Sequence, residues 1–125
     1  MSLLHAVVLI DHHSALLLKF SADEVQSEKV KEHKQYTRQH HSGVRTEHEF
    51  FGEVCDAVEG RAEVLVVGAH QAQADFKHYV EKHRPALTPH IVGWQTVDHP
   101  SDGELLALAR KFFLTFDRTG LPPQS

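Results

Sequence analysis

The stretch Glu63-Val64-Leu65-Val66-Val67-Gly68 decides the fold of this chain. It is a continuous apolar run, rich in β-branched residues, with no alternation of polar and apolar positions. Such a run is typical of a strand that is buried on both faces, which occurs mainly in parallel pairing. Parallel strands need long crossover connections, usually helices. We therefore expect a helix before this strand and another after it.

The segment before the strand has the pattern of an amphipathic helix. Thr46, with acidic residues at 47 and 49, is typical of a helix start. Apolar residues then recur at helical spacing, and Gly60 supplies the stop. The helical positions that we expect to face the core are Phe50, Phe51, Val54, Cys55 and Val58.

The segments after the strand continue the same alternation of helix and strand. Apolar residues at helical spacing predict a helix over 71–83, which Pro85 ends. A strand is predicted over 90–97, followed by a final helix that begins at Ser101 or Asp102.

The first third of the chain is rich in short apolar runs. Residues 5–10 and 15–20 are separated by Asp11-His12-His13-Ser14, so they predict a β-hairpin. Residues 25 to about 34 are polar and fit either an edge strand or a surface helix, and we favour the strand because it completes a meander. The resulting order βββαβαβα predicts an α/β, ribonuclease-H-like fold with a mixed five-stranded sheet.

The chain of 125 residues is long enough for one domain with a proper core, which we assign to residues 1–116. Residues 117–125, with Gly120 and two prolines, are expected to form a flexible tail. No apolar run is long enough to span a membrane, and the start lacks the pattern of a signal peptide. The single cysteine, Cys55, excludes an internal disulfide, fits a reducing cytoplasm, and is expected to be buried and inert.

A polar, histidine-rich segment over residues 33–48 separates the first third from the rest. Its surroundings are basic: residues 28–45 hold five Lys or Arg against two acids, a local net charge of +3 in a chain whose net charge is −4. Long polar loops inside small domains are often functional. The basic and aromatic residues that we assign to RNA binding are Lys29, Lys31, Lys34, Tyr36, Arg38, His40, His41 and Arg45.

Two chemical alternatives remain open at this stage. The histidines of the segment, His33, His40, His41 and His48, could hold a transition metal, although their spacing is irregular and no cysteine accompanies them. A metal-dependent nuclease on this fold would need converging carboxylates, for which Asp11 with Glu47 or Glu49 are the candidates. The predicted fourth strand ends without an acid, so the carboxylate set is incomplete.

Three stretches of the sequence resemble one family. Residues 45–54, 63–68 and 76–80, together with the turn at 11–14, resemble the middle domain of archaeal and eukaryotic class-one peptide release factors and of Pelota ribosome-rescue proteins. The closest likeness is to small bacterial stand-alone proteins called translational machinery components. The resemblance implies the ribonuclease-H-like translational-machinery fold and a partner in translation.

The sequence departs from the release-factor pattern at two places. Release factors carry Gly-Gly-Gln in the loop before the first helix, whereas this chain has Gln39-His40-His41-Ser42-Gly43-Val44. Relatives often have Gly-Pro-Gly and a lysine after the fourth strand, whereas this chain has Gly68-Ala69-His70 and then Gln73. It also has none of the codon-reading or partner-binding domains that flank the middle domain in release factors.

The sequence therefore predicts a cytoplasmic, non-catalytic protein without a cofactor that binds the ribosome or structured RNA through residues 29–48. The alternative is a metal-dependent nuclease or other hydrolase. A third possibility is a small homo-oligomer in which an apolar sheet edge pairs with a second copy.

Overall fold

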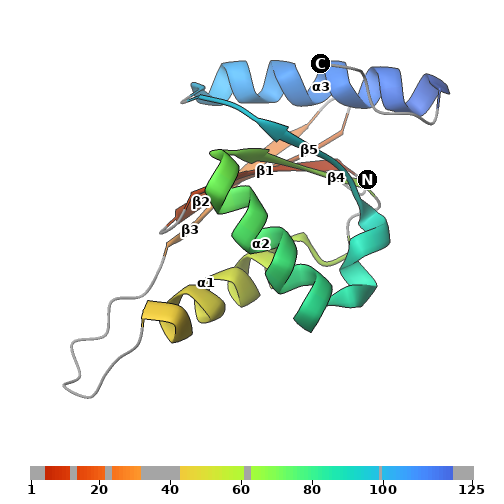
Figure 1. Cartoon of the computed structure of the whole chain (residues 1–125). Coiled ribbons are helices and arrows are strands. Elements are labelled where there is room, and N and C mark those ends of the chain that lie inside the picture. The colour runs from red at the N-terminus through yellow and green to blue at the C-terminus, as the bar shows by residue number, and fades with distance from the viewer. Residues whose placement is uncertain are drawn as a thin grey trace.

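A mixed sheet of five strands, in the order β3-β2-β1-β4-β5, forms the centre of the computed structural model (Figure 1). The structure describes residues 5–11, 14–21, 24–31, 43–60, 63–98 and 100–119, and the side chains of these except 43–47 and 116–119. The strands are β1 (His5–Ile10), β2 (Ser14–Phe20), β3 (Val25–Lys31), β4 (Glu63–Gly68) and β5 (Ile91–Thr96). The helices are α1 (Gly43–Val58), α2 (His70–His83), the 3-10 helix η1 (Pro85–His90) and α3 (Asp102–Thr119).

The strand pairing confirms the predicted ribonuclease-H-like α/β fold. β1 pairs with β2 and β2 with β3 in antiparallel register, as a meander requires. β4 pairs with β1 and β5 in parallel register, and α1 and α2 supply the crossovers. The strand predicted at residues 25 to about 34 is present as the edge strand β3, which the structure describes as far as Lys31.

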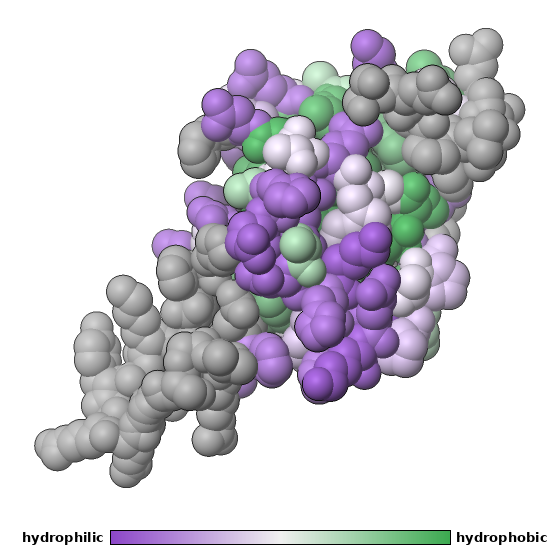
Figure 2. All heavy atoms as spheres, viewed as in Figure 1, coloured by the Kyte–Doolittle hydropathy of each residue, from purple (hydrophilic) through white to green (hydrophobic). Residues whose placement is uncertain are grey.

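Two hydrophobic cores lie on opposite faces of the sheet. Side chains of α1 and α2 pack on one face and those of α3 on the other, as the layers in Figure 1 show. β4 contributes to both cores because Val64 and Val66 face α1 and α2, whereas Leu65 and Val67 face α3. All four side chains are fully buried, which explains why this strand has no polar alternation. Figure 2 shows that hydrophilic side chains cover the outward side of α2.

Several element bounds differ from the sequence prediction. α1 begins at Gly43, three residues before Thr46, because the Thr46 capping signal lies inside the helix and Gly43-Val44-Arg45 contains no residue that prevents helix formation. η1 was not predicted, since its six residues, which include Pro85 and Pro89, form only two 3-10 turns and leave no periodic pattern to detect. α3 continues through Thr119, so residues 117–119 of the predicted tail are helical, and residues 120–125 lie outside the described part.

Predictions about individual residues of α1 are confirmed. Gly60 follows the helix with a positive φ of 88°, the conformation that favours glycine after a helix C-terminus. Cys55 is buried in the core between α1, α2 and the sheet. Burial raises the pKa of its thiol to about 11, so the reactive thiolate is disfavoured at neutral pH.

Within the described ranges, no helix is both long and apolar enough to cross a membrane.

Candidate functional site

The carboxyl ends of β1, β4 and β5 lie together at one end of the sheet, on the left in Figure 1. From β1 the chain turns into β2 on one side, whereas from β4 it enters α2 and crosses to β5 on the other side. The chain thus leaves two adjacent strands in opposite directions, which opens a crevice outside their ends. In open α/β sheets this topological switch point is where ligands usually bind.

Gly68 allows the ends of β4 and β1 to pack closely. Its φ is +148°, and a Cβ atom added to it would lie 2.3 Å from the carbonyl oxygen of Ile10. Any side chain at this position would therefore collide with backbone that cannot move away easily. The residue is required by the approach of the two strands and is not evidence of a nucleotide-binding loop.

Gln73 fixes the turn that follows Gly68. Its side chain is buried, and its amide Nε2 donates hydrogen bonds to the Gly68 carbonyl at 2.8 Å and to Thr96 Oγ1 at 3.3 Å. The backbone N–H of Val97 donates to the same Gly68 carbonyl at 3.1 Å. These bonds join the start of α2 to the ends of β4 and β5. A buried amide with its donors used in this way stabilises the geometry of the sheet end.

A pocket of about 300 Å³ lies at this end of the sheet, and we call it the carboxyl-end pocket. Apolar side chains of Leu9, Leu16 and Val97, which also pack against the core under α3, form part of its lining. Charged side chains from three separate segments of the chain also line the pocket. The twelve lining residues are Leu9, Ile10, Asp11, Ser14, Ala15, Leu16, Lys29, Lys31, Gly68, Ala69, Val97 and Asp98.

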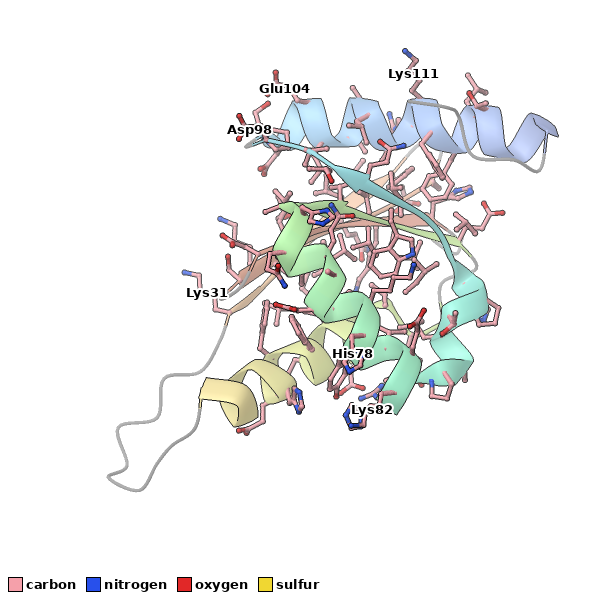
Figure 3. All side chains as sticks on the ribbon, viewed as in Figure 1. Lys31, His78, Lys82, Asp98, Glu104 and Lys111 are labelled. Atoms are coloured by element: carbon pink, nitrogen blue, oxygen red, sulfur yellow. The ribbon has the colours of Figure 1, made fainter. Side chains whose placement is uncertain are left out.

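Lysines and carboxylates approach the pocket from different elements. Lys29 and Lys31 come from the edge strand β3, Asp11 follows β1, and Asp98 follows β5. Figure 3 shows Lys31 and Asp98 at the same end of the molecule, whereas Lys82 and Lys111 lie elsewhere. Counted over the described part of the chain, the pocket therefore has two positive and two negative groups around an apolar lining.

The two sides of β3 carry different residues because strand side chains alternate. Val30 is buried in the core under α1. Glu28 forms an ion pair with Lys19, whose Nζ lies 2.7 Å from Glu28 Oε1. Lys29 and Lys31 alternate with these residues, so they lie on the other side of the strand. Both are exposed, and neither has an ion-pair partner among the described residues.

Most of the predicted RNA-binding segment cannot be placed. Lys29 and Lys31 are close together on β3, and Arg45 belongs to the first turn of α1, where only the backbone is described. The first turn of α1 contains no acidic residue. The remaining predicted residues, Lys34, Tyr36, Arg38, His40 and His41, lie outside the described residues.

Among the described side chains, the alternative catalytic residues Asp11 and Glu49 line different cavities. Asp11 lines the carboxyl-end pocket, but Glu49 lines a separate groove between α1 and α2, and the side chain of Glu47 is not described. The prediction paired these residues because the register of α1 against the sheet cannot be read from the sequence. Asp98 was not among the predicted site residues, because its only signal in the sequence was its position directly after a predicted strand.

The groove between α1 and α2 is built around an ion pair. The guanidinium of Arg84 donates to Asp56 Oδ1 at 2.7 Å, and this hydrogen bond raises the pKa of Arg84. Beside it, the ring of His48 lies 5.3 Å from that of Tyr79 and 5.5 Å from that of His83. This ring contact between residues 48 and 83 could not be predicted from the sequence, because the two residues lie on different helices.

The metal prediction gains no support from the described part of the chain, where no three His, Cys, Asp or Glu residues are grouped to hold an ion. Of its four histidines only His48 is described, and its ring neighbours are Tyr79 and His83. The other three, His33, His40 and His41, fall outside the described residues.

No family model matches the sequence, and no curated protein matches it. Among solved structures, the chain resembles the crystal structure of Pelota from Archaeoglobus fulgidus, with a TM-score of 0.58 at 17% sequence identity. The match covers 86% of this chain but only 30% of the Pelota chain. The likeness is therefore one of fold to part of a larger protein, and it agrees with the family suggested by the sequence motifs.

Proposed function

We propose that this protein is a translation-related RNA-binding protein that associates with the ribosome through its basic, histidine-rich segment, residues 29–48. The observation that carries the proposal is the pair Lys29 and Lys31, exposed on the same side of an edge strand without an ion-pair partner among the described residues. Unpaired surface lysines on a protein with net charge −4 are positioned to contact phosphates rather than to stabilise the fold.

The sequence that follows β3 extends this basic surface. Lys34, Arg38 and Arg45 add positive charge, and Tyr36, His40 and His41 provide rings that can stack on unpaired bases. The positive end of the α1 dipole, with no acid in its first turn, adds a weak attraction for phosphate. The surface therefore combines phosphate contacts with stacking, as single-stranded RNA binding requires.

The fold likeness to Pelota supports the same assignment. We extend it to the small bacterial stand-alone translational machinery components and place the protein in the cytoplasm. Without Gly-Gly-Gln before α1, the chain lacks the tripeptide with which release factors promote ester hydrolysis. We infer a role in binding rather than in peptidyl-tRNA hydrolysis.

Co-sedimentation with ribosomes over a series of salt concentrations tests the proposal. The wild-type protein should pellet with ribosomes at low salt and be released as salt rises, because phosphate contacts release counterions. Alanine at all five positions (Lys29, Lys31, Lys34, Arg38 and Arg45) should abolish pelleting.

The matched control replaces two exposed lysines far from β3, Lys82 on α2 and Lys111 on α3, by alanine (Figure 3). This variant should pellet like the wild type, which would show that removing lysines elsewhere on the surface does not weaken the association. Absence of wild-type association at low salt, or unchanged association of the five-residue variant, refutes the proposal.

A further inference from the structure

The carboxyl-end pocket has a chemical character that a general phosphate-binding surface does not need. We propose that it holds a single nucleotide, with the phosphate against Lys29 and Lys31 and the base over the apolar lining of Leu9, Leu16 and Val97. This inference rests on the proposed function, which it deepens by naming where one nucleotide of the RNA sits.

The position of the pocket supports a ligand site independently of its charges. It lies outside the carboxyl ends of β1 and β4, where the chain departs to opposite sides. Gly68 and Gln73 hold these strand ends in place through close packing and buried hydrogen bonds. The site is therefore built on strand ends that close packing and buried hydrogen bonds hold together.

The balance of charges selects the class of ligand. Among the lining residues that the structure describes, two lysines balance two aspartates in charge, so a simple anion gains little from entering the pocket. Lys29 and Lys31 come from one strand, whereas Asp11 and Asp98 follow two others. A ligand that suits this arrangement has an anionic end, a flat apolar body and hydrogen-bond donors. A nucleotide has all three.

The size of the pocket limits how the nucleotide is presented. About 300 Å³ is at the small end of the range for small-molecule sites, which suits one nucleotide and excludes a base pair. RNA-binding proteins commonly read unpaired bases that are separated from their neighbours. The ligand is therefore a nucleoside monophosphate unit, either free or as an unpaired residue of RNA.

The carboxylates give the pocket a preference among bases. An ionised carboxylate only accepts hydrogen bonds and has about four lone-pair positions, so Asp11 and Asp98 can accept from a ligand as well as from protein groups. Adenine, guanine and cytosine each carry an exocyclic amino group with two N–H donors, whereas uracil has no amino group and offers only its ring N3–H. We expect weaker binding of uridine monophosphate than of the other three.

Titration of the ¹⁵N-labelled full chain with the four nucleoside 5′-monophosphates, followed by NMR, tests the inference. The resonances that shift should belong to the ends of β1, β3, β4 and β5. Uridine monophosphate should bind several-fold more weakly than cytidine monophosphate, and inorganic phosphate alone should cause little shift. A single-stranded oligoribonucleotide that competes for the same resonances identifies RNA as the source, and binding of free nucleotides alone identifies a small-molecule ligand.

Two variants remove binding by different means. Lys29→Ala/Lys31→Ala should weaken nucleotide binding at least tenfold, whereas Lys82→Ala/Lys111→Ala should leave it unchanged. Ala69→Trp places a large ring at the exposed mouth of the pocket and keeps both lysines, so it should also abolish nucleotide binding. Dispersed NMR spectra of each variant confirm that it is folded.

The inference is overturned if no monophosphate binds at millimolar concentration, if phosphate alone reproduces the shifts, or if Ala69→Trp binds nucleotides like the wild type. These outcomes leave the proposed function intact when ribosome association still depends on the basic residues. Loss of the proposed function appears separately, as ribosome co-sedimentation that is absent or insensitive to the five-residue replacement.

Discussion

The two sides of β3 carry residues of different kinds. On the side of α1, Val30 is buried in the core and Glu28 pairs with Lys19. On the other side, Lys29 and Lys31 are exposed beside the carboxyl-end pocket. Alternation along a strand places buried residues that stabilise the protein on one side and exposed residues on the other. Each set can therefore be substituted without changing the other.

The largest expected effect on stability comes from substituting Gly68, because this residue allows the end of β4 to pack closely against the end of β1. Gly68→Ala should lower the free energy of unfolding by about 3 kcal/mol or more, since its Cβ would lie 2.3 Å from the Ile10 carbonyl oxygen. Gly103→Ala in the first turn of α3 is the matched control, with nothing within 4 Å. It should be neutral or slightly stabilising in urea unfolding; equal losses in both variants would contradict the packing account.

Val30 and Lys29 are adjacent, so alanine at each tests the two sides of β3 directly. Val30→Ala removes buried methyl groups and should cost about 1–2 kcal/mol of stability. Lys29→Ala should change stability by less than about 0.5 kcal/mol, because the side chain is exposed and unpaired in the described structure. Urea unfolding measures both. A larger loss from Lys29→Ala than from Val30→Ala would reverse the assignment of the two sides.

The ion pair between Lys19 and Glu28 gives a smaller effect on the α1 side. Glu28→Gln should cost no more than about 1 kcal/mol, because the glutamate is largely exposed and the solvent screens the pair. The loss should shrink in high salt, which thermal unfolding at two ionic strengths can measure. RNA binding should be unaffected, and a defect in binding would show that this pair also contributes to the contact surface.

The smallest expected effect on stability comes from substituting Glu104, near the start of α3. The backbone N–H of Ser101 donates a hydrogen bond to Glu104 Oε1 at 2.8 Å, and this bond, together with the nearby Ser101 hydroxyl, lowers the pKa of the Glu104 carboxyl group. A pKa that is lower in the folded state adds stability above the unfolded value of about 4.3, and this contribution is lost as pH falls through the lower folded value. Glu104→Gln should therefore narrow the difference in stability between pH 7 and pH 3. An unchanged difference would show that the carboxylate does not contribute.

The fold could be predicted from the sequence to the extent that periodic apolar patterns determine it. The continuous run at 63–68 predicted a strand buried on both faces, and the helical spacing from Phe50 to Val58 predicted the core face of α1. η1 could not be predicted, because its six residues form too short a helix to show a period.

The candidate site was predicted only in part. The charge pattern singled out Lys29 and Lys31, which do lie together. The pocket beside them depends on how separate strand ends converge, so the only signal for Asp98 was its position directly after a predicted strand. For the same reason the sequence paired Asp11 with Glu49, which line different cavities.

The central claim is that Lys29 and Lys31 contact phosphates, and the salt dependence of RNA affinity tests it most directly. In a plot of log affinity against log salt concentration for a single-stranded oligoribonucleotide, Lys29→Ala/Lys31→Ala should make the slope shallower by about 1.4, at about 0.7 for each lost contact. Lys82→Ala/Lys111→Ala should keep the wild-type slope. If the two double variants have the same slope, the lysines of β3 are not phosphate contacts and the account is contradicted.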